Sequence, residues 1–132
     1  MRLSEDKIKE LIDEAIKARE NAYTPYSHFK VGALVVDEKG HHHSGCNIEN
    51  GSYGLTNCGE RTAIFNGVSN GMKNIDIIVI VADTTGPVSP CGACRQVIKE
   101  FSNDNTVIIL ANLKKDYKIM SMEELLPYGF QL

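Results

Sequence analysis

The chain has 132 residues, a length that predicts one folded domain over residues 1–132 with a buried hydrophobic core. Its formal net charge is −3 and its basic residues are scattered, which argues against nucleic acid as a partner, because polyanion binding needs a basic face. There is no apolar run that could cross a bilayer and no apolar segment of a secretory signal in residues 1–6, so we expect a cytoplasmic protein that acts on a small molecule and not at a membrane.

The first half of the chain predicts a helix followed by a hairpin. Apolar residues spaced by three and four indicate a helix over residues 4–23, with Ser4 as its N-cap. Residues 29–36 are rich in valine and predict a strand, which a turn joins to a return strand over residues 41–48.

Three consecutive histidines, His41, His42 and His43, open that return strand. Alternation along a strand would point His42 away from the other two, and no partner at a fixed spacing accompanies them. We therefore interpret the three as an exposed loop edge and not as a zinc site.

The second half alternates helices and strands. It predicts a loop over 47–54, a helix from Cys58 to about residue 70, buried strands over 75–82 and 106–111, a helix from Cys91 to about residue 101, a short strand over 117–120 and a final helix from 121 that Pro127 ends. Strand, helix and strand around Cys91 form a βαβ unit, whose two strands should be parallel. The whole predicts an α/β fold, a mixed sheet with helices on its faces.

The stretch from Ser89 to Gln96 contains two cysteines at the start of a helix. Ser89 is a suitable N-cap and Pro90 suits the first helical position, so that Cys91 and Cys94 share one face of the first turn. The positive end of the helix dipole favours thiolates there. A metal site, a redox couple or a disulfide could use them, and without an export signal metal or thiol chemistry is favoured over a disulfide.

A third cysteine, Cys58, begins the preceding helix and is followed by Glu60. If both helices start at the same end of the sheet, Cys58, Cys91 and Cys94 can converge on one zinc ion and leave its fourth position for water. Glu60 would then move protons beside that water. Arg61 lies three positions after Cys58, and Arg95 lies directly after Cys94. Both are expected to donate hydrogen bonds to the sulfurs.

Cys58-Gly59-Glu60 together with Pro90-Cys91-Gly92-Ala93-Cys94 resembles the signature of the zinc deaminases in its three-cysteine form. The resemblance extends to the small homotetrameric cytidine deaminases through residues 23–27, 29–33, 45–50, 60–63, 86–90 and 123–127. It implies a three-layer α/β/α sandwich around a mixed five-stranded sheet, with one Zn²⁺ per subunit. The implied reaction is hydrolytic deamination of cytidine and 2′-deoxycytidine to uridine and 2′-deoxyuridine, as in pyrimidine salvage.

The same resemblance implies roles for six further residues. Phe29 would stack on the pyrimidine, Asn47 and Glu49 would bind the ribose 3′-hydroxyl, the backbone at Gly59 would hold the base carbonyl, and Tyr53 and Phe130 would reach the site from neighbouring subunits of a homotetramer. The family usually has alanine where Gly59 stands, and we expect this difference to affect stability modestly and not activity.

Four alternatives remain open from the sequence. Within the superfamily these are a deaminase of RNA or DNA bases, disfavoured by the negative charge, and a deaminase of a nucleoside antibiotic. Outside it are a closed four-cysteine structural zinc with Cys46 as the fourth ligand, and a thiol oxidoreductase that uses the C-x-x-C pair. Neither of the last two has a use for Glu60.

Overall fold

The computed structural model describes residues 3–132. Its strands are β1 (Val31–Asp37), β2 (His42–Cys46), β3 (Ile75–Ala82), β4 (Val107–Asn112) and β5 (Tyr117–Met120). Its helices are α1 (Glu5–Arg19), α2 (Gly59–Ser69), α3 (Gly92–Glu100) and α4 (Met122–Leu125), with a 3₁₀ turn, η1, at Tyr53–Leu55.

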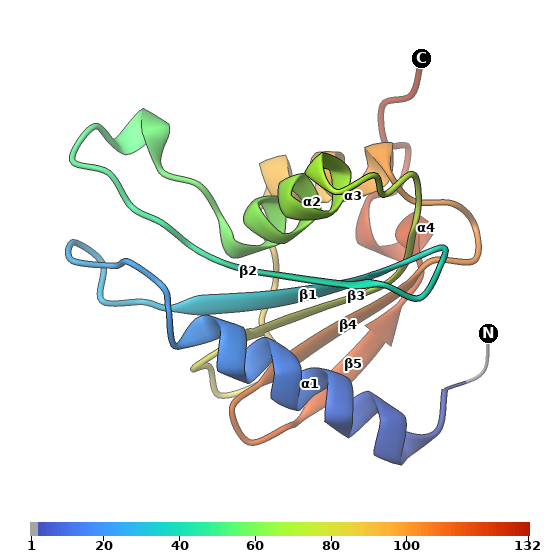
Figure 1. Ribbon diagram of the computed structural model, residues 1–132, viewed down its shortest axis with the longest axis horizontal. Coiled ribbons are helices and arrows are strands. Elements are labelled where there is room, and N and C mark those ends of the chain that lie inside the picture. Colours follow the sequence, from blue (N-terminus) through green and yellow to red (C-terminus); the bar gives the residue numbers. More distant parts are fainter. Residues whose placement is uncertain (1–2) are drawn as a thin grey trace.

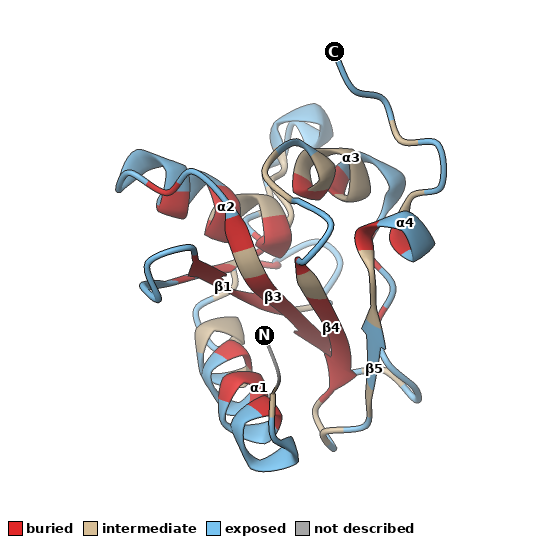
Figure 2. Cartoon of the chain, turned by 90° about the vertical axis from the view of Figure 1, so that its right-hand side faces the viewer, coloured by how far each residue is buried: buried red, intermediate tan, exposed pale blue. Residues whose placement is uncertain are grey.

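The five strands form one mixed sheet in the order β2-β1-β3-β4-β5. Helix α1 covers one face, and α2 and α3 cover the other (Figure 1). β3 lies in the middle of the sheet and is apolar from Ile77 to Ala82: Ile78 and Ile80 join the core under α2 and α3, while Val79 and Val81 join the core under α1. Figure 2 shows the resulting buried centre of the sheet between exposed helix surfaces. The predicted three-layer sandwich is confirmed.

Strand directions place the starts of α2 and α3 at one edge of the sheet. β1 pairs antiparallel with both β2 and β3, so β2 and β3 run in the same direction and end at the same edge. The chain leaves β2 there to begin α2, and leaves β3 there to begin α3. β3 and β4 are parallel, as the βαβ pattern predicts.

Two predicted helix boundaries are wrong. Ser4 does cap α1, but the helix ends at Arg19 and not at residue 23, because the Tyr23 N–H donates to the carbonyl of Asn47. The N-cap of α3 is Cys91, whose sulfur accepts from the Cys94 N–H, and not Ser89. The Ser89 hydroxyl instead accepts a hydrogen bond from the side chain of Arg95.

The interpretation of the three histidines as an exposed loop edge is wrong for His43. That side chain points inward from β2 and its Nε2 lies 2.8 Å from Asp37 Oδ2. Burial raises the pKa of Asp37, but hydrogen bonds from His43 and from the backbone of His41 and Lys39 outweigh it and lower that pKa to about 2. By accepting these hydrogen bonds, the buried Asp37 carboxylate holds the β1–β2 turn in place.

Over residues 3–132, no helix combines the length and apolar character that crossing a membrane requires.

Candidate active site

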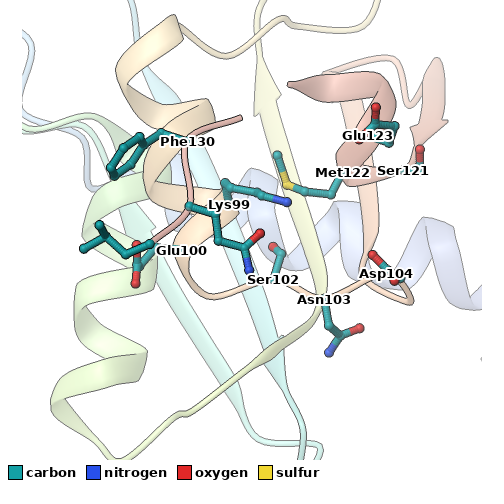
Figure 3. Close-up of a pocket in the computed structure, with 11 residues that line it drawn as sticks. Lys99, Glu100, Ser102, Asn103, Asp104, Ser121, Met122, Glu123 and Phe130 are labelled. Atoms are coloured by element: carbon teal, nitrogen blue, oxygen red, sulfur yellow. The ribbon is translucent and has the colours of Figure 1, made fainter. Parts of the chain in front are cut away.

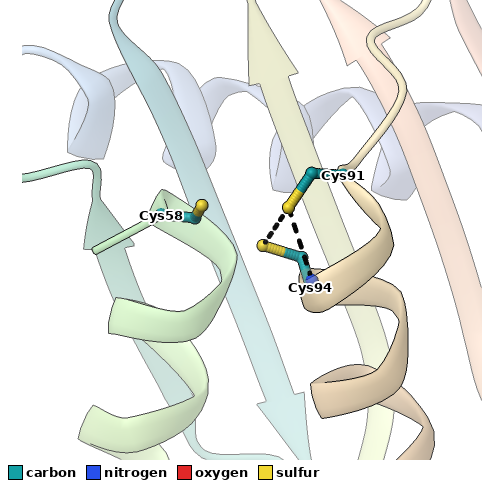
Figure 4. Close-up of side chains that lie close together, drawn as sticks. All are labelled: Cys58, Cys91 and Cys94. Atoms are coloured by element: carbon teal, nitrogen blue, oxygen red, sulfur yellow. Dashed lines mark hydrogen bonds between the residues drawn. The ribbon is translucent and has the colours of Figure 1, made fainter. Parts of the chain in front are cut away.

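The sulfurs of Cys58, Cys91 and Cys94 converge at the sheet edge where α2 and α3 begin. All three ligand atoms lie within 4.8 Å of one another. Cys58 is the N-cap of α2 and Cys91 the N-cap of α3, while Cys94 stands in the first turn of α3 (Figure 4). The Cys91 and Cys94 sulfurs are 3.4 Å apart. Two helix N-termini thus direct their positive ends at one cluster of thiols.

The local charges favour a thiolate in this cluster. A hydrogen bond from Cys94, aided by Arg61, lowers the pKa of the Cys58 thiol to about 5 although burial opposes it. The shared proton and burial together raise the pKa of Cys94. Three cysteine sulfurs within 4.8 Å of one another form a donor set that suits Zn²⁺, and they leave a fourth tetrahedral position open.

The two arginines expected to donate to the sulfurs behave differently. Arg61 Nη2 donates to Cys58 Sγ at 3.1 Å, and its buried Nε has no partner within residues 3–132. Arg95 makes no such contact with sulfur, so that expectation is wrong. It donates to the carbonyls of Pro90 at 3.0 Å and Leu125 at 2.7 Å, and so ties the loop before Cys91 to α4.

Glu60 lies on the first turn of α2, directly behind the cluster. Its side chain is buried, with only 4% of its surface exposed. Burial raises its pKa, and the negative Cys58 sulfur adds to the effect. A carboxyl group held in this way is suited to carry a proton between two partners.

A cavity of about 290 Å³ opens beside the cluster and Glu60. Its lining includes most of the residues predicted from the sequence: Phe29, Asn47, Glu49, Cys58, Gly59, Glu60 and Cys91. Ile80 and Val88 provide apolar wall, and Phe29 exposes 42% of its surface, which leaves an aromatic face available to a ligand. The cavity combines apolar walls with a few convergent polar groups, as small-molecule sites do.

Asn47 and Glu49 are held by the backbone and still have hydrogen-bonding capacity. Asn47 Oδ1 accepts from the Val31 N–H at 2.8 Å and its Nδ2 donates to the Phe29 carbonyl at 2.8 Å, which leaves one amide hydrogen. Glu49 Oε1 accepts from the N–H groups of Tyr26 and Ser27, and a lone pair remains on Oε2. One hydroxyl group could therefore accept from Asn47 and donate to Glu49.

Ser27 is a residue of this site that the sequence reasoning missed. It lines the cavity, its hydroxyl donates to Glu49 Oε2, and it accepts from the Phe29 N–H at 3.0 Å. That hydrogen bond is the main reason why the pKa of Glu49 is lowered. The signals in the sequence were its place in the family-like segment 23–27 and its position two residues before Phe29.

Gly59 lies where α2 approaches β1 closely. A Cβ at this position would stand 3.1 Å from the Val31 carbonyl oxygen and 3.4 Å from the Asn47 nitrogen. An alanine would therefore need a small adjustment of the neighbouring backbone, a few tenths of an ångström.

Tyr53 and Phe130 do not line the cavity of their own chain. Tyr53 is 76% exposed and packs edge-on against Tyr26, with ring centroids 6.1 Å apart. Phe130 is 67% exposed and borders a different, polar cavity of about 630 Å³ between α3, α4 and the C-terminal segment (Figure 3). That cavity includes no other residue of the predicted site.

Cys46 does not belong to the cluster. In the part of the chain that the structure describes, the only group of three or more candidate metal ligands is Cys58, Cys91 and Cys94. Cys46 lies at the end of β2, and burial raises the pKa of its thiol. The closed four-cysteine site therefore lacks its fourth ligand.

Comparisons with known proteins agree with this arrangement. Residues 5–111 match the family described as the cytidine and deoxycytidylate deaminase zinc-binding region. The chain is 53% identical over 123 residues to a cytidine deaminase of Sporosarcina psychrophila, which covers 93% of this chain and 90% of the relative. A crystal structure of cytidine deaminase from Burkholderia pseudomallei superposes with a TM-score of 0.90 at 44% identity, over 97% of this chain and 100% of the other. A blasticidin-S deaminase of Bacillus cereus is 34% identical over 129 residues, which cover 92% of this chain and 90% of the relative.

Proposed function

The chain belongs to the cytidine and deoxycytidylate deaminase family and is a hydrolytic deaminase, and from this premise we propose that it converts cytidine and 2′-deoxycytidine to uridine and 2′-deoxyuridine with release of ammonia. The observation that carries the proposal is the cluster of Cys58, Cys91 and Cys94 at a cavity that Glu60 and Phe29 also line. We place the reaction in pyrimidine salvage and the enzyme in the cytoplasm.

Cys58, Cys91 and Cys94 would hold one Zn²⁺ per subunit. When bound, the ion lowers the pKa of a coordinated water and so supplies a nucleophile at neutral pH. The chain's own contribution is to offset charge: the two helix N-termini and the Arg61 guanidinium oppose the negative charge that three metal-bound thiolates would bring together.

The substrate would be oriented by groups on both sides of the cavity. Phe29 would stack on the pyrimidine ring, and the first backbone N–H of α2, at Gly59, has no partner within the helix and could donate to the base carbonyl. The free amide hydrogen of Asn47 would donate to the ribose 3′-hydroxyl, and that hydroxyl would donate to Glu49. The 4-amino carbon would then face Glu60.

Glu60 would transfer both protons of the reaction. Its carboxylate takes a proton from the attacking water and gives it to ring N3, while the water oxygen bonds to C4 and makes that carbon tetrahedral. Glu60 then takes the remaining proton from the oxygen on C4 and delivers it to the amine, the C4–N bond breaks as the C4 carbonyl forms, and ammonia leaves. Burial of Glu60 keeps these protons from exchanging with bulk water.

Tyr53 and Phe130 support the proposal of a homotetramer with shared active sites. Both side chains are exposed and lie outside the cavity of their own chain, where they are available to a neighbouring subunit. Sedimentation equilibrium should give the mass of a tetramer, and a monomer that turns over at full rate would contradict this part of the proposal.

A substrate panel tests the proposed reaction. Purified protein is incubated with cytidine, 2′-deoxycytidine, blasticidin S or single-stranded oligonucleotides, and ammonia release is measured together with the loss of cytidine absorbance. We expect equimolar ammonia and uridine from the free nucleosides. Preference for blasticidin S would transfer the assignment to the antibiotic deaminases, of which one relative is an example.

A further inference from the structure

The loop from Thr24 to Phe29 carries the side chain proposed to stack on the base, yet it belongs to no helix or strand. Within it, His28 has a φ of 58°, a left-handed conformation that is unfavourable for a residue with a side chain. Such a conformation persists only where surrounding contacts fix it. The contacts that fix this loop therefore determine where Phe29 stands.

Every backbone N–H from Tyr26 to Phe29 is engaged. The N–H groups of Tyr26 and Ser27 donate to Glu49 Oε1 at 3.0 and 3.1 Å. The His28 N–H donates to the Thr24 carbonyl at 3.0 Å, and the Phe29 N–H donates to Ser27 Oγ at 3.0 Å. Glu49 and Ser27 thus account for three of these four bonds.

The Ser27 hydroxyl joins the two sides of the ligand site. It has one hydrogen, which it donates to Glu49 Oε2, and its oxygen accepts from the Phe29 N–H. The polarity of this chain is fixed, because an ionised carboxylate only accepts and a backbone N–H only donates. The hydroxyl therefore sets the position of the proposed ribose acceptor relative to the proposed base-stacking ring.

We propose that Ser27 is a positioning residue for nucleoside binding: its hydroxyl, held in direction by the Phe29 N–H, orients the Glu49 carboxylate toward the sugar 3′-hydroxyl. This role deepens the proposed function and rests on it. Ser27 itself does not touch the reacting atoms. Its loss should therefore weaken binding of the sugar and leave the chemical step nearly unchanged.

The test is Ser27→Ala, with binding measured by calorimetry for uridine and for 3′-deoxyuridine, which lacks only the hydroxyl in question. We expect the dissociation constant for uridine to rise about tenfold, the lower end for a hydrogen bond to a charged group, and that for 3′-deoxyuridine to change by less than about twofold. With cytidine as substrate, KM should rise about tenfold while kcat stays within about twofold.

Two variants separate positioning from general structural damage. Ser27→Thr retains the hydroxyl and should restore uridine affinity to within about threefold, whereas Ser69→Ala removes an exposed serine far from the cavity and should change nothing. If Ser27→Ala does not fold, Ser27→Cys preserves the volume with a much weaker donor and should give the same discrimination between the two ligands.

Three results would overturn the role of Ser27. These are equal weakening of uridine and 3′-deoxyuridine, no weakening of either, and failure of the unmodified protein to bind uridine. The proposed function is judged separately, by whether unmodified protein releases ammonia from cytidine. Normal turnover with equal weakening of both ligands would therefore reject Ser27 and keep the deaminase.

Discussion

Replacing Glu60 with glutamine probes the proposed chemistry with almost no change in shape. The side chain is 4% exposed, and burial together with the Cys58 thiolate raises its pKa, so its negative charge is unfavourable where it stands. Neutral glutamine of the same size removes that charge. We therefore expect Glu60→Gln to unfold with a free energy no lower than that of the unmodified protein.

Turnover should respond very differently from stability. One positioned proton carrier contributes about 10²–10⁴-fold, and Glu60 is proposed to serve two transfers, so kcat should fall by at least about 10⁴, equivalent to about 5.5 kcal/mol. The assay follows cytidine absorbance, with zinc content by mass spectrometry and urea unfolding on the same samples. Glu123→Gln, an exposed residue of α4, is the matched control and should be fully active. Turnover of Glu60→Gln above about one hundredth of normal, with zinc bound, would refute the assigned role.

Three further predictions follow from individual contacts. Arg61→Gln removes the 3.1 Å bond to Cys58 and should weaken zinc binding about tenfold or more, measured by competition with a chromogenic chelator; unchanged affinity would contradict it. Asp37 has a pKa lowered from 3.8 to about 2, so its stabilisation is complete above pH 4 and is lost as the pH falls through 2. Asp37→Asn should accordingly cost about 2 kcal/mol of unfolding free energy at pH 6 and nothing near pH 2, and a difference that is independent of pH would reject this reasoning. Gly59→Ala would bring a Cβ to 3.1 Å from the Val31 carbonyl and should cost about 1 kcal/mol of stability with kcat retained, whereas loss of turnover would show that glycine is required there.

The sequence was most informative where hydrophobic pattern alone decides the structure. The run over residues 75–82, apolar except for Asp76, indicated a strand buried on both faces, and β3 packs against both cores. The hairpin and βαβ patterns gave the antiparallel β1–β2 and parallel β3–β4 pairs, while the antiparallel β1–β3 pairing, which brings Cys58 to the same sheet edge as Cys91 and Cys94, came only from the structure. The features predicted correctly depend on local chemistry and on few topological choices.

The expectations that failed depend on contacts between distant residues. Arg95 directly follows Cys94 in sequence, but its side chain donates to carbonyl groups in the loop before Cys91 and in α4, and not to a sulfur. His43 seemed part of an exposed edge because its partner, Asp37, lies across a turn whose geometry the sequence did not specify. Ser27 was overlooked for the same reason, since Glu49 is 22 positions away.

Metal removal shows whether the three-cysteine cluster holds a zinc ion that deamination of cytidine requires. Protein as purified should contain one zinc per chain, lose ammonia release from cytidine when a chelator removes the metal, and regain it when zinc is restored at equal molar amount. Cys58→Ser should bind zinc poorly and stay inactive after the same addition. Full turnover by the metal-free protein, or bound zinc with no deamination of any pyrimidine nucleoside, would contradict a catalytic zinc site in this cluster.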